Sequence, residues 1–278
     1  METNEKIKSL VREKYTEIAA QDKAVNASSC CGCGPTCDST YTIMSEDYTK
    51  LEGYNADADL ALGCGIPTSI ARIREGDTVV DLGSGAGNDC FVARALTGAD
   101  GRVIGIDMTE AMIEKAKANA AKLGFGNVEF RLGEIEKIPM TSNRADVVLS
   151  NCVLNLVPDK QKAFTEMFRI LKPGGHFSIS DVVLNGELPE GIRKAGEMYA
   201  GCVSGAIPKE DYLGMLAASG FSNIRIEKEK AIDIPDNILL SYISEDELRA
   251  FRASGNGISS ITVYGEKPAA CCAPGCCD

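Results

Sequence analysis

Apolar residues near the start of the chain recur every three or four positions, as they do along one face of a helix. This pattern predicts an amphipathic helix over residues 4–21, with Asn4 as its cap. The apolar face of that helix consists of Ile7, Leu10, Val11, Tyr15 and Ile18. A segment rich in serine, glycine and proline at 28–40 then predicts a loop, and short helical pieces are expected over 45–74.

From residue 75 the pattern changes to short continuous apolar runs separated by helical patterns. The run TVVDL at 78–82 is closed by glycines, which is typical of a strand buried in a parallel sheet. The alternation of strands and helices favours an α/β fold with a doubly wound, Rossmann-like sheet. Expected strands are 78–82, 102–107, 128–132, 145–150 and 176–183. Expected helices are 88–97, 109–123 capped by Thr109 and stopped by Gly124, and 159–171 ended by a PGG sequence.

After residue 184 the alternation loosens. The pattern predicts helices over 191–204 and 208–219 and strands over 223–232 and 260–267. The last two strands are expected to form an antiparallel edge, which makes a seven-stranded, mostly parallel sheet. Four regions follow: an N-terminal helix and cysteine-rich loop covering the site (1–74), a nucleoside-cofactor-binding core (75–185), a substrate-binding and sheet-edge region (186–268), and a flexible cysteine-rich tail (269–278).

Composition narrows the function. The chain has 278 residues, 44% of them hydrophobic, and a formal net charge of −11. Such a surface repels phosphate backbones and anionic lipids, so neither nucleic acid nor a membrane is an expected partner. No apolar run approaches the roughly 20 residues that cross a bilayer. The charged first residues, METNEKIKSLVREK, do not form a signal peptide, so a cytoplasmic protein is expected, and we expect a monomer.

Cysteine is the outlier, with 12 residues in a chain that is expected to lie in a reducing compartment. Such cysteines are buried packing, metal ligands or reactive thiols. Two clusters occupy the N-terminal loop and the last eight residues, and the other cysteines stand alone; we expect Cys90 to be packing. The clusters are Cys30, Cys31, Cys33 and Cys37, and Cys271, Cys272, Cys276 and Cys277; the isolated ones are Cys64, Cys90, Cys152 and Cys202.

A glycine-rich loop, DLGSGAG at 81–87, lies between the first expected strand and its helix. Glycines allow a tight turn there and let backbone N–H groups approach a ligand at the helix N-terminus. Asp107 ends the second strand, where a carboxylate can accept hydrogen bonds from both hydroxyls of a ribose. A tight turn for packing alone would not need that acid, so the combination favours a nucleoside cofactor.

DLGSGAG resembles the first motif of the class I S-adenosylmethionine methyltransferases, and this resemblance implies the cofactor and its contacts. Asp81 and the backbone of Gly83, Ser84 and Gly85 would hold the methionine part of S-adenosylmethionine. Asp107 would hold the ribose. The remaining residues assigned to the cofactor by the resemblance are Met108, Glu134 and Ile135, around the adenine, and Asn151.

Strand four leads into SNCVLNLVPDKQ, which places Cys152 just past the carboxyl end of a strand, where open α/β sheets bind ligands. Together with VREKY at 11–15, GCG at 63–65 and GIDMT at 105–109, this segment resembles the arsenite S-adenosylmethionine methyltransferases over about residues 11–265. The resemblance implies that arsenite and methylated arsenicals are the substrates. It also implies three arsenic-binding thiols, Cys64, Cys152 and Cys202, and a fourth catalytic cysteine, either Cys30 or Cys31.

The chemistry agrees with this resemblance. Trivalent arsenic is thiophilic, takes three sulfur ligands and keeps a lone pair that can attack a sulfonium methyl group without a general base. His176 is the only histidine and begins a strand, which favours a structural role. A thiol reductant, glutathione or thioredoxin, is expected as co-substrate. We expect Cys30 or Cys31 to form a transient disulfide with Cys64 that supplies electrons between rounds.

Two other functions fit parts of the sequence. A class I methyltransferase that acts on a small organic acceptor, such as a quinone precursor, would have the same fold and cofactor. An apolar acceptor pocket with a base would favour that enzyme, whereas converging thiols favour a metalloid. A thiol-rich metal-sequestering protein would explain the cysteine clusters but would not need the 81–87 loop and Asp107.

Overall fold

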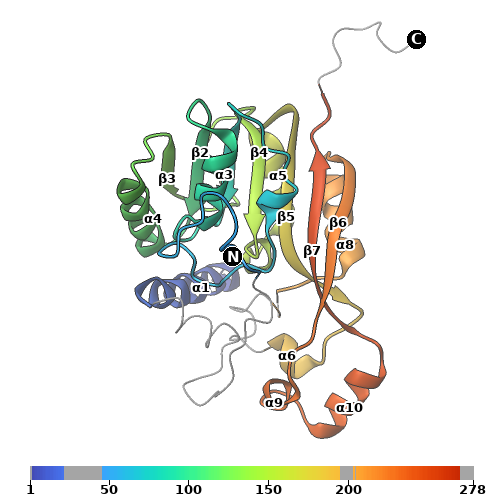
Figure 1. The fold of residues 1–278 in the computed structure, drawn as a ribbon. Helices are drawn as coiled ribbons and strands as arrows, with labels where there is room; N and C mark the ends of the chain where they lie inside the picture. The colour runs from blue at the N-terminus through green and yellow to red at the C-terminus, as the bar shows by residue number, and fades with distance from the viewer. Residues whose placement is uncertain (1, 22–45, 195–202, 204, 270–278) are drawn as a thin grey trace, which may run out of the picture.

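A computed structural model describes residues 2–21, 46–194, 203 and 205–269 (Figure 1). The first helix and the alternating core follow the sequence pattern closely. These elements are α1 (Glu2–Ala20), η1 (Pro67–Ser69), β1 (Thr78–Leu82), α3 (Asn88–Thr97), β2 (Arg102–Asp107), α4 (Glu110–Leu123), β3 (Val128–Leu132), β4 (Ala145–Asn151), η2 (Leu154–Leu156) and α5 (Lys160–Ile170). The rest are β5 (Leu171–Asn185), α6 (Glu190–Lys194), α8 (Lys209–Ala218), β6 (Ser222–Ile232), α9 (Asp236–Leu239), α10 (Glu245–Ala253) and β7 (Gly257–Glu266).

The seven strands form one sheet in the order β3-β2-β1-β4-β5-β7-β6. Strands β1 to β5 pair in parallel, whereas β7 runs antiparallel to both β5 and β6. This arrangement confirms the expected seven-stranded, mostly parallel sheet with an antiparallel edge. The strand order reverses between β1 and β4, and open α/β sheets bind ligands at that place, beyond the carboxyl ends of the strands.

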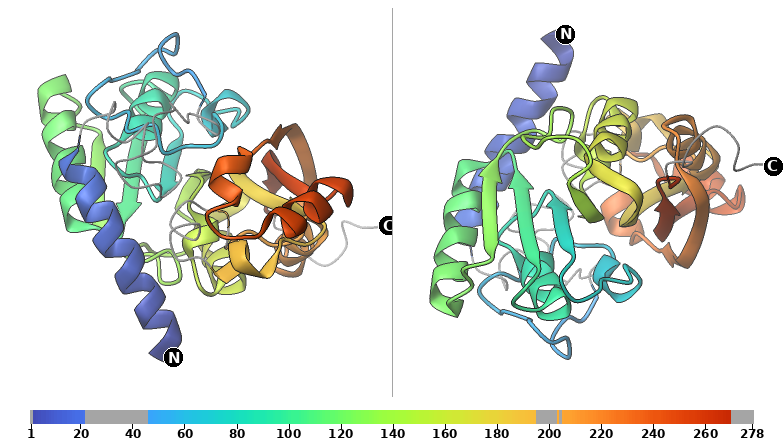
Figure 2. Two further views of the ribbon diagram at one scale, coloured as in Figure 1. Left: turned by 90° about the horizontal axis from the view of Figure 1, so that it is seen from below. Right: turned by 90° about the horizontal axis from the view of Figure 1, so that it is seen from above.

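Helices cover both faces of the sheet (Figures 1 and 2). Alternate residues of each strand point to opposite faces. Val79 packs with α1, α3 and α4, whereas its neighbour Val80 packs with α5 and α8. A third apolar cluster lies at the end of the sheet where α6, α9 and α10 are found. It joins residues far apart in the sequence, including Val11, Cys64 and Cys152.

Several local expectations are wrong. Between 46 and 74 the structure has turns and the single short helix η1, because hydrogen bonds such as Leu51 N–H to the Tyr48 carbonyl close isolated turns. Thr109 occupies the start of α4 without a side-chain cap, and Asp107 Oδ1 accepts its N–H instead. Leu123, the last residue of that helix, is 37% exposed and does not belong to the core.

The expected strand 176–183 is longer than the pattern indicates. Strand β5 begins at Leu171, so Pro173-Gly174-Gly175 lies inside this strand and α5 ends at Ile170. The pairing of β4 with β5 shifts its register at a bulge between Ala145 and Val147, which accommodates this segment. Helices α9 and α10 were not expected, although Ser244 and Glu247 form a capping box that the sequence displays. The described part of the 191–204 helix is α6; residues 195–202 and 204 lie outside the described residues.

No helix in the described parts of the chain combines the length and the apolar character that a bilayer crossing requires.

Candidate active site

The loop at 81–87 turns sharply between β1 and α3. Gly83 has φ +73°, and a side chain there would collide with Val153, since an added Cβ would lie 2.3 Å from it. At Gly85, φ is +50° and an added Cβ would meet nothing within 4 Å. Gly83 therefore allows the close approach of the loop after β4, while Gly85 leaves space beside the helix N-terminus.

One pocket lies beside this loop at the carboxyl ends of the strands. All nine residues that the class I resemblance assigns to the cofactor line it. They are Asp81, Gly83, Ser84, Gly85, Asp107, Met108, Glu134, Ile135 and Asn151. The structure thus brings together every expected cofactor residue in one pocket, and their individual roles stay predictions.

The pocket is rich in buried acids. Asp81 is 2% exposed, and burial together with the charge of Asp89 raises the pKa of its carboxyl well above the usual range. Burial also raises the pKa of Asp107, although the N–H groups of Thr109 and Gly85 lower it in part. Such carboxyls are stabilised in their charged form by a cationic ligand. Cys90, expected to be packing, is buried on α3 and contacts the site, because its Sγ donates to Asp81 Oδ2 at 3.3 Å.

Asp107 already has partners in the protein. Its Oδ2 accepts the Gly85 N–H at 3.0 Å and its Oδ1 accepts the Thr109 N–H at 2.9 Å. These bonds join the end of β2 to the glycine loop and to the start of α4. Each carboxylate oxygen can accept a second hydrogen bond, so the expected ribose contacts remain available.

Two buried polar atoms on the pocket wall lack a hydrogen-bond partner. They are Ser84 Oγ and Asn88 Oδ1, which stand in the loop and in the first turn of α3. An unpaired buried polar atom costs free energy unless a ligand or water satisfies it.

Helix α1 closes one side of the pocket. Val11 and Tyr15 line it, and Lys8 Nζ forms ion pairs with Glu134 at 2.8 Å and with Glu136. The two acids follow β3, at the expected adenine end of the pocket. Figure 2 shows α1 lying across the end of the sheet where the parallel strands finish. Helix α1 therefore forms part of the pocket wall, and the role of the whole 1–74 region as a cover over the site stays a prediction.

Cys152 has a special backbone position. It follows β4 with φ +59°, which is rare for a residue other than glycine, and its N–H donates to the Ser180 carbonyl at 2.8 Å. A strained residue of this kind is typical of functional sites. The side chain is buried and lines the cofactor pocket.

Cys64 reaches the same region from a distant part of the chain. Its N–H donates to Asn151 Oδ1 at 3.1 Å, and its carbonyl accepts the hydroxyl of Ser260 at 2.5 Å. Gly63, rather than Cys64, lines the cofactor pocket, and Cys64 is 1% exposed. Cys64 and Cys152 belong to one buried cluster that also holds Val203.

Comparison with known proteins identifies the family. The model of a methyltransferase domain matches residues 73–236. An arsenite methyltransferase of Halobacterium salinarum is 41% identical over 95% of this chain and 68% of its own length, and that of Aquipseudomonas alcaligenes is 31% identical over 84% and 68%. The crystal structure of an arsenic(III) S-adenosylmethionine methyltransferase from Chlamydomonas reinhardtii is also similar. Its sequence is 35% identical, the match covers 75% of this chain and 68% of the algal chain, and the TM-score is 0.63.

The chain belongs to the arsenite methyltransferase family. The class I methyltransferase fold and the expected resemblance are therefore confirmed. The expected ligand set of this arsenite methyltransferase is described only in part. Cys202, Cys30 and Cys31 lie outside the described residues. Within those residues no group of three or more His, Cys, Asp or Glu side chains could hold a metal ion, so the three-thiol set stays a prediction.

Sequence reasoning missed several residues of this arsenite methyltransferase site. Tyr48 and Asp89 are buried and line the cofactor pocket, and both form hydrogen bonds with Asn151. Tyr212 and Asp181 form a buried pair that does not line the pocket, and burial, the charge of Asp181 and the nearby thiols of Cys64 and Cys152 raise the pKa of Tyr212. Two of these residues had a signal in the sequence: Asp89, eight residues after Asp81 and in the first turn of α3, and Asp181, an acid near the end of the fifth expected strand.

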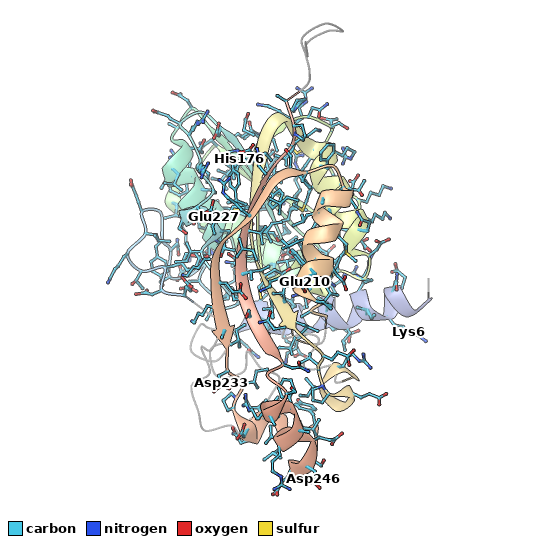
Figure 3. The ribbon with its side chains drawn as sticks, turned by 90° about the vertical axis from the view of Figure 1, so that its right-hand side faces the viewer. Lys6, His176, Glu210, Glu227, Asp233 and Asp246 are labelled. Carbon is cyan, nitrogen blue, oxygen red and sulfur yellow. The ribbon has the colours of Figure 1, made fainter. Side chains whose placement is uncertain are left out.

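His176 has a structural position in this arsenite methyltransferase. Its ring stacks on Tyr264 at 5.3 Å, and its Nε2 lies 2.5 Å from the Ala71 carbonyl oxygen. In Figure 3 it lies towards the upper end of the sheet, well away from α1, which carries Lys6. It does not line the cofactor pocket.

Proposed function

We propose that this chain methylates arsenite, with S-adenosylmethionine as methyl donor and with trivalent arsenic held by the thiolates of Cys64, Cys152 and Cys202. The observation that carries the proposal is the single carboxamide of Asn151. It belongs to the residue before Cys152 and accepts the backbone N–H of Cys64, so it holds two cysteines 88 positions apart in one region beside the cofactor pocket. The family membership and the buried Val203 beside Cys202 support the same assignment.

The residues of the pocket fit the donor. Its α-ammonium group suits the acid Asp81, its ribose hydroxyls suit Asp107, and its carboxylate suits the N-terminal end of α3. When bound, S-adenosylmethionine supplies an electrophilic methyl group on a positively charged sulfur. The protein orients the acceptor towards this pocket and excludes water from it.

The thiols act as ligands and need no base. Three thiols displace the three hydroxides of arsenite, and each thiol proton leaves with a hydroxide as water. The arsenic keeps its lone pair on the open face of the three-sulfur pyramid. Cys152 lines the pocket, so it directs that face towards the cofactor. Burial of Cys64 and Cys152 in an apolar cluster protects the bound arsenic from exchange with water.

Methylation oxidises arsenic by two electrons, because the new carbon–arsenic bond uses the lone pair and raises arsenic from the trivalent to the pentavalent state. The thiol of Cys30 or Cys31 loses its proton to solvent and attacks the arsenic-bound sulfur of Cys64. The S–S bond forms, the arsenic–Cys64 bond breaks, and its electron pair stays on arsenic, which becomes trivalent again and keeps two sulfur ligands and the methyl group. An external thiol reductant, glutathione or thioredoxin, then reduces the disulfide.

A radiolabelled methyl-transfer assay tests the proposal. Cys152→Ser replaces a soft ligand by a hard, protonated one, so the rate of arsenite methylation is expected to fall at least about a hundredfold. The matched control is Cys33→Ser, which also removes one thiol but lies outside the expected ligand set. Arsenite methylation by Cys152→Ser at the rate of the Cys33→Ser control would contradict the three-thiol mechanism. Transfer to a quinone precursor with none to arsenite would favour the organic-acceptor alternative.

A further inference from the structure

The side chain of Asn151 is the centre of a buried hydrogen-bond network. Its Oδ1 accepts the N–H of Cys64 at 3.1 Å. Its Nδ2 lies 2.8 Å from Tyr48 Oη, 3.0 Å from the Gly65 carbonyl and 3.0 Å from Asp89 Oδ2. Tyr48 Oη lies in turn 2.9 Å from Asp89 Oδ1 and 2.9 Å from the Gly65 carbonyl. The side-chain amide of Asn151 therefore forms hydrogen bonds with the backbone at Cys64 and at the next residue, Gly65.

Counting hydrogens shows how the charge of Asp89 sets the direction of the bonds in the network. Asn151 supplies two N–H groups and Tyr48 supplies one O–H. When Asp89 is ionised, both of its oxygens accept, one from Asn151 and one from Tyr48. When Asp89 is protonated, one of its oxygens becomes a donor, so a bond in the network must reverse its direction and the bonds to Asp89 lose their charge assistance.

Asp89 faces the cofactor pocket as well as the network. It stands in the first turn of α3, is 7% exposed and lines the pocket. Its electrostatic neighbours are two acids, Asp59 and Asp81, and one thiol, Cys90. No described lysine or arginine forms an ion pair with it. Burial raises the pKa of Asp89 to about 6, although its bonds to Asn151 and Tyr48 lower it.

We propose that Asp89 is a positioning residue that couples cofactor binding to arsenic binding, through Asn151 and Tyr48, by fixing the backbone on both sides of Cys64. A positive charge in the pocket stabilises the ionised form of Asp89, because it offsets the repulsion from Asp81. Ionised Asp89 forms charge-assisted hydrogen bonds with Asn151 and Tyr48, which are stronger than neutral ones. The segment Gly63–Gly65 is then held in one geometry beside Cys152.

The packing leaves this segment little freedom. An added Cβ at Gly63 would lie 2.6 Å from Asn151 Nδ2, and one at Gly65 would lie 2.5 Å from Ser180 Oγ. The segment thus sits directly between Asn151 and β5. A small rotation of the Asn151 amide, when it loses Asp89, would shift the N–H contact of Cys64. Placement of the Cys64 thiol is in this way tied to the charge of a residue in the cofactor pocket.

This inference rests on the proposed function, and binding measurements separate the two. Arsenite affinity is measured by calorimetry on the full chain, in the absence of cofactor, with S-adenosylhomocysteine, and with sinefungin. Sinefungin is a non-reactive analogue that carries an amine near the position of the sulfonium. Wild-type affinity for arsenite is expected to rise at least about fivefold with sinefungin and by less with the neutral-sulfur product. By reciprocity, arsenite raises sinefungin affinity by the same factor.

Asp89→Asn removes the charge and keeps the shape, so its arsenite affinity is expected to change less than twofold when sinefungin is added. Tyr48→Phe removes one donor to Asp89, and the coupling factor is expected to lie between those of the wild type and Asp89→Asn. The matched control is Glu46→Gln, an acid of the same pocket that pairs with Lys228 and is not among the groups that act on Asp89. This control lowers cofactor affinity through lost charge but keeps the coupling factor of the wild type.

A purely structural role for Asp89 would weaken arsenite binding equally with and without sinefungin, and that result would overturn the inference. Wild-type coupling that persists in both Asp89→Asn and Tyr48→Phe would overturn it too. Wild-type protein that binds arsenite with no coupling would overturn the inference and leave the proposed function intact. Wild-type protein that binds no arsenite at all would contradict the proposed function and, with it, this inference.

Discussion

At the scale of single residues, Asp181 shows how complete burial changes the pKa of a carboxyl group. It is 0% exposed within β5, and its carboxyl accepts hydrogen bonds from Tyr212 Oη at 3.1 Å and from the Val182 N–H at 2.9 Å. Burial raises its pKa to about 7, although Val182, the charge of Lys160 and Tyr212 lower it in part. The unfolded chain binds this proton only below about pH 4.

This raised pKa predicts a specific pH dependence of stability. Between the two pKa values the folded state holds the proton and the unfolded state does not, so the free energy of unfolding falls as pH rises. Relative to Asp181→Asn, the wild type is expected to lose about 2 kcal/mol between pH 5 and 7 and little more above pH 8. Urea denaturation at each pH measures this difference. Asp246→Asn, an exposed acid, is the control. Parallel curves for wild type and Asp181→Asn would show that Asp181 titrates normally.

At the scale of elements, α1 is attached to the core through the cofactor pocket. Lys8 is 12% exposed in its side chain and pairs with Glu134 and with Glu136, itself 7% exposed. Burial lowers the pKa of Lys8, but the hydrogen bonds and charges of the two acids raise it more. Loss of the lysine would leave Glu136 buried without its cation, which costs more than an exposed ion pair contributes.

Lys8→Met is therefore expected to loosen α1 and to weaken S-adenosylhomocysteine binding about tenfold, equivalent to about 1.4 kcal/mol. Calorimetry gives the affinity, and hydrogen exchange of the α1 amides reports the loosening. Lys14→Met is the matched control, because Lys14 stands on the same helix and, among the described residues, forms its one ion pair with Glu17 at 3.6 Å. Equal affinities for Lys8→Met and Lys14→Met would mean that α1 contributes nothing to cofactor binding.

The elements also show how far the sequence could predict the fold. The strand Thr78–Leu82 could be predicted because it is an apolar run closed by glycines. The end of α4 at Gly124 could be predicted because backbone geometry there depends on local residues. Strand β5 was placed too short, since its Pro173-Gly174-Gly175 segment is held by pairing with the distant Lys267. Tertiary hydrogen bonds of this kind leave no periodic signal.

At the scale of the whole molecule, the site is assembled from segments that no local pattern connects. The apolar cluster around Cys64 and Cys152 takes Val11 from α1 and Ile238 from α9. The expected cofactor residues could be found because they follow one motif on consecutive strands. The Tyr48–Asp89–Asn151 network could not, because Tyr48 lies in a segment of turns and only the tertiary fold brings it to Asn151.

The whole fold also bears on the terminal cysteine cluster, which lies outside the described residues. Strand β7 passes the site where Thr262 pairs with Ser180, and it leaves the sheet at Glu266, opposite His176. The described chain therefore leads away from Cys152 before that cluster begins (Figure 1). The sequence after Pro268 also lacks large apolar side chains that could pack firmly against the core.

Deletion of residues 269–278 is therefore expected to leave the maximal rate of methylation within about twofold, a change of less than 1 kcal/mol in the barrier. Paired thiols on a tethered segment can still chelate arsenite and raise its local concentration, so bound arsenic per chain is expected to fall. The rate comes from saturating radiolabel assays, and the stoichiometry from equilibrium dialysis. A variant with serine at Cys271, Cys272, Cys276 and Cys277 keeps the length and should behave alike. A collapse of the maximal rate in both variants would place these thiols in the catalytic site and contradict the assignment to Cys64, Cys152 and Cys202.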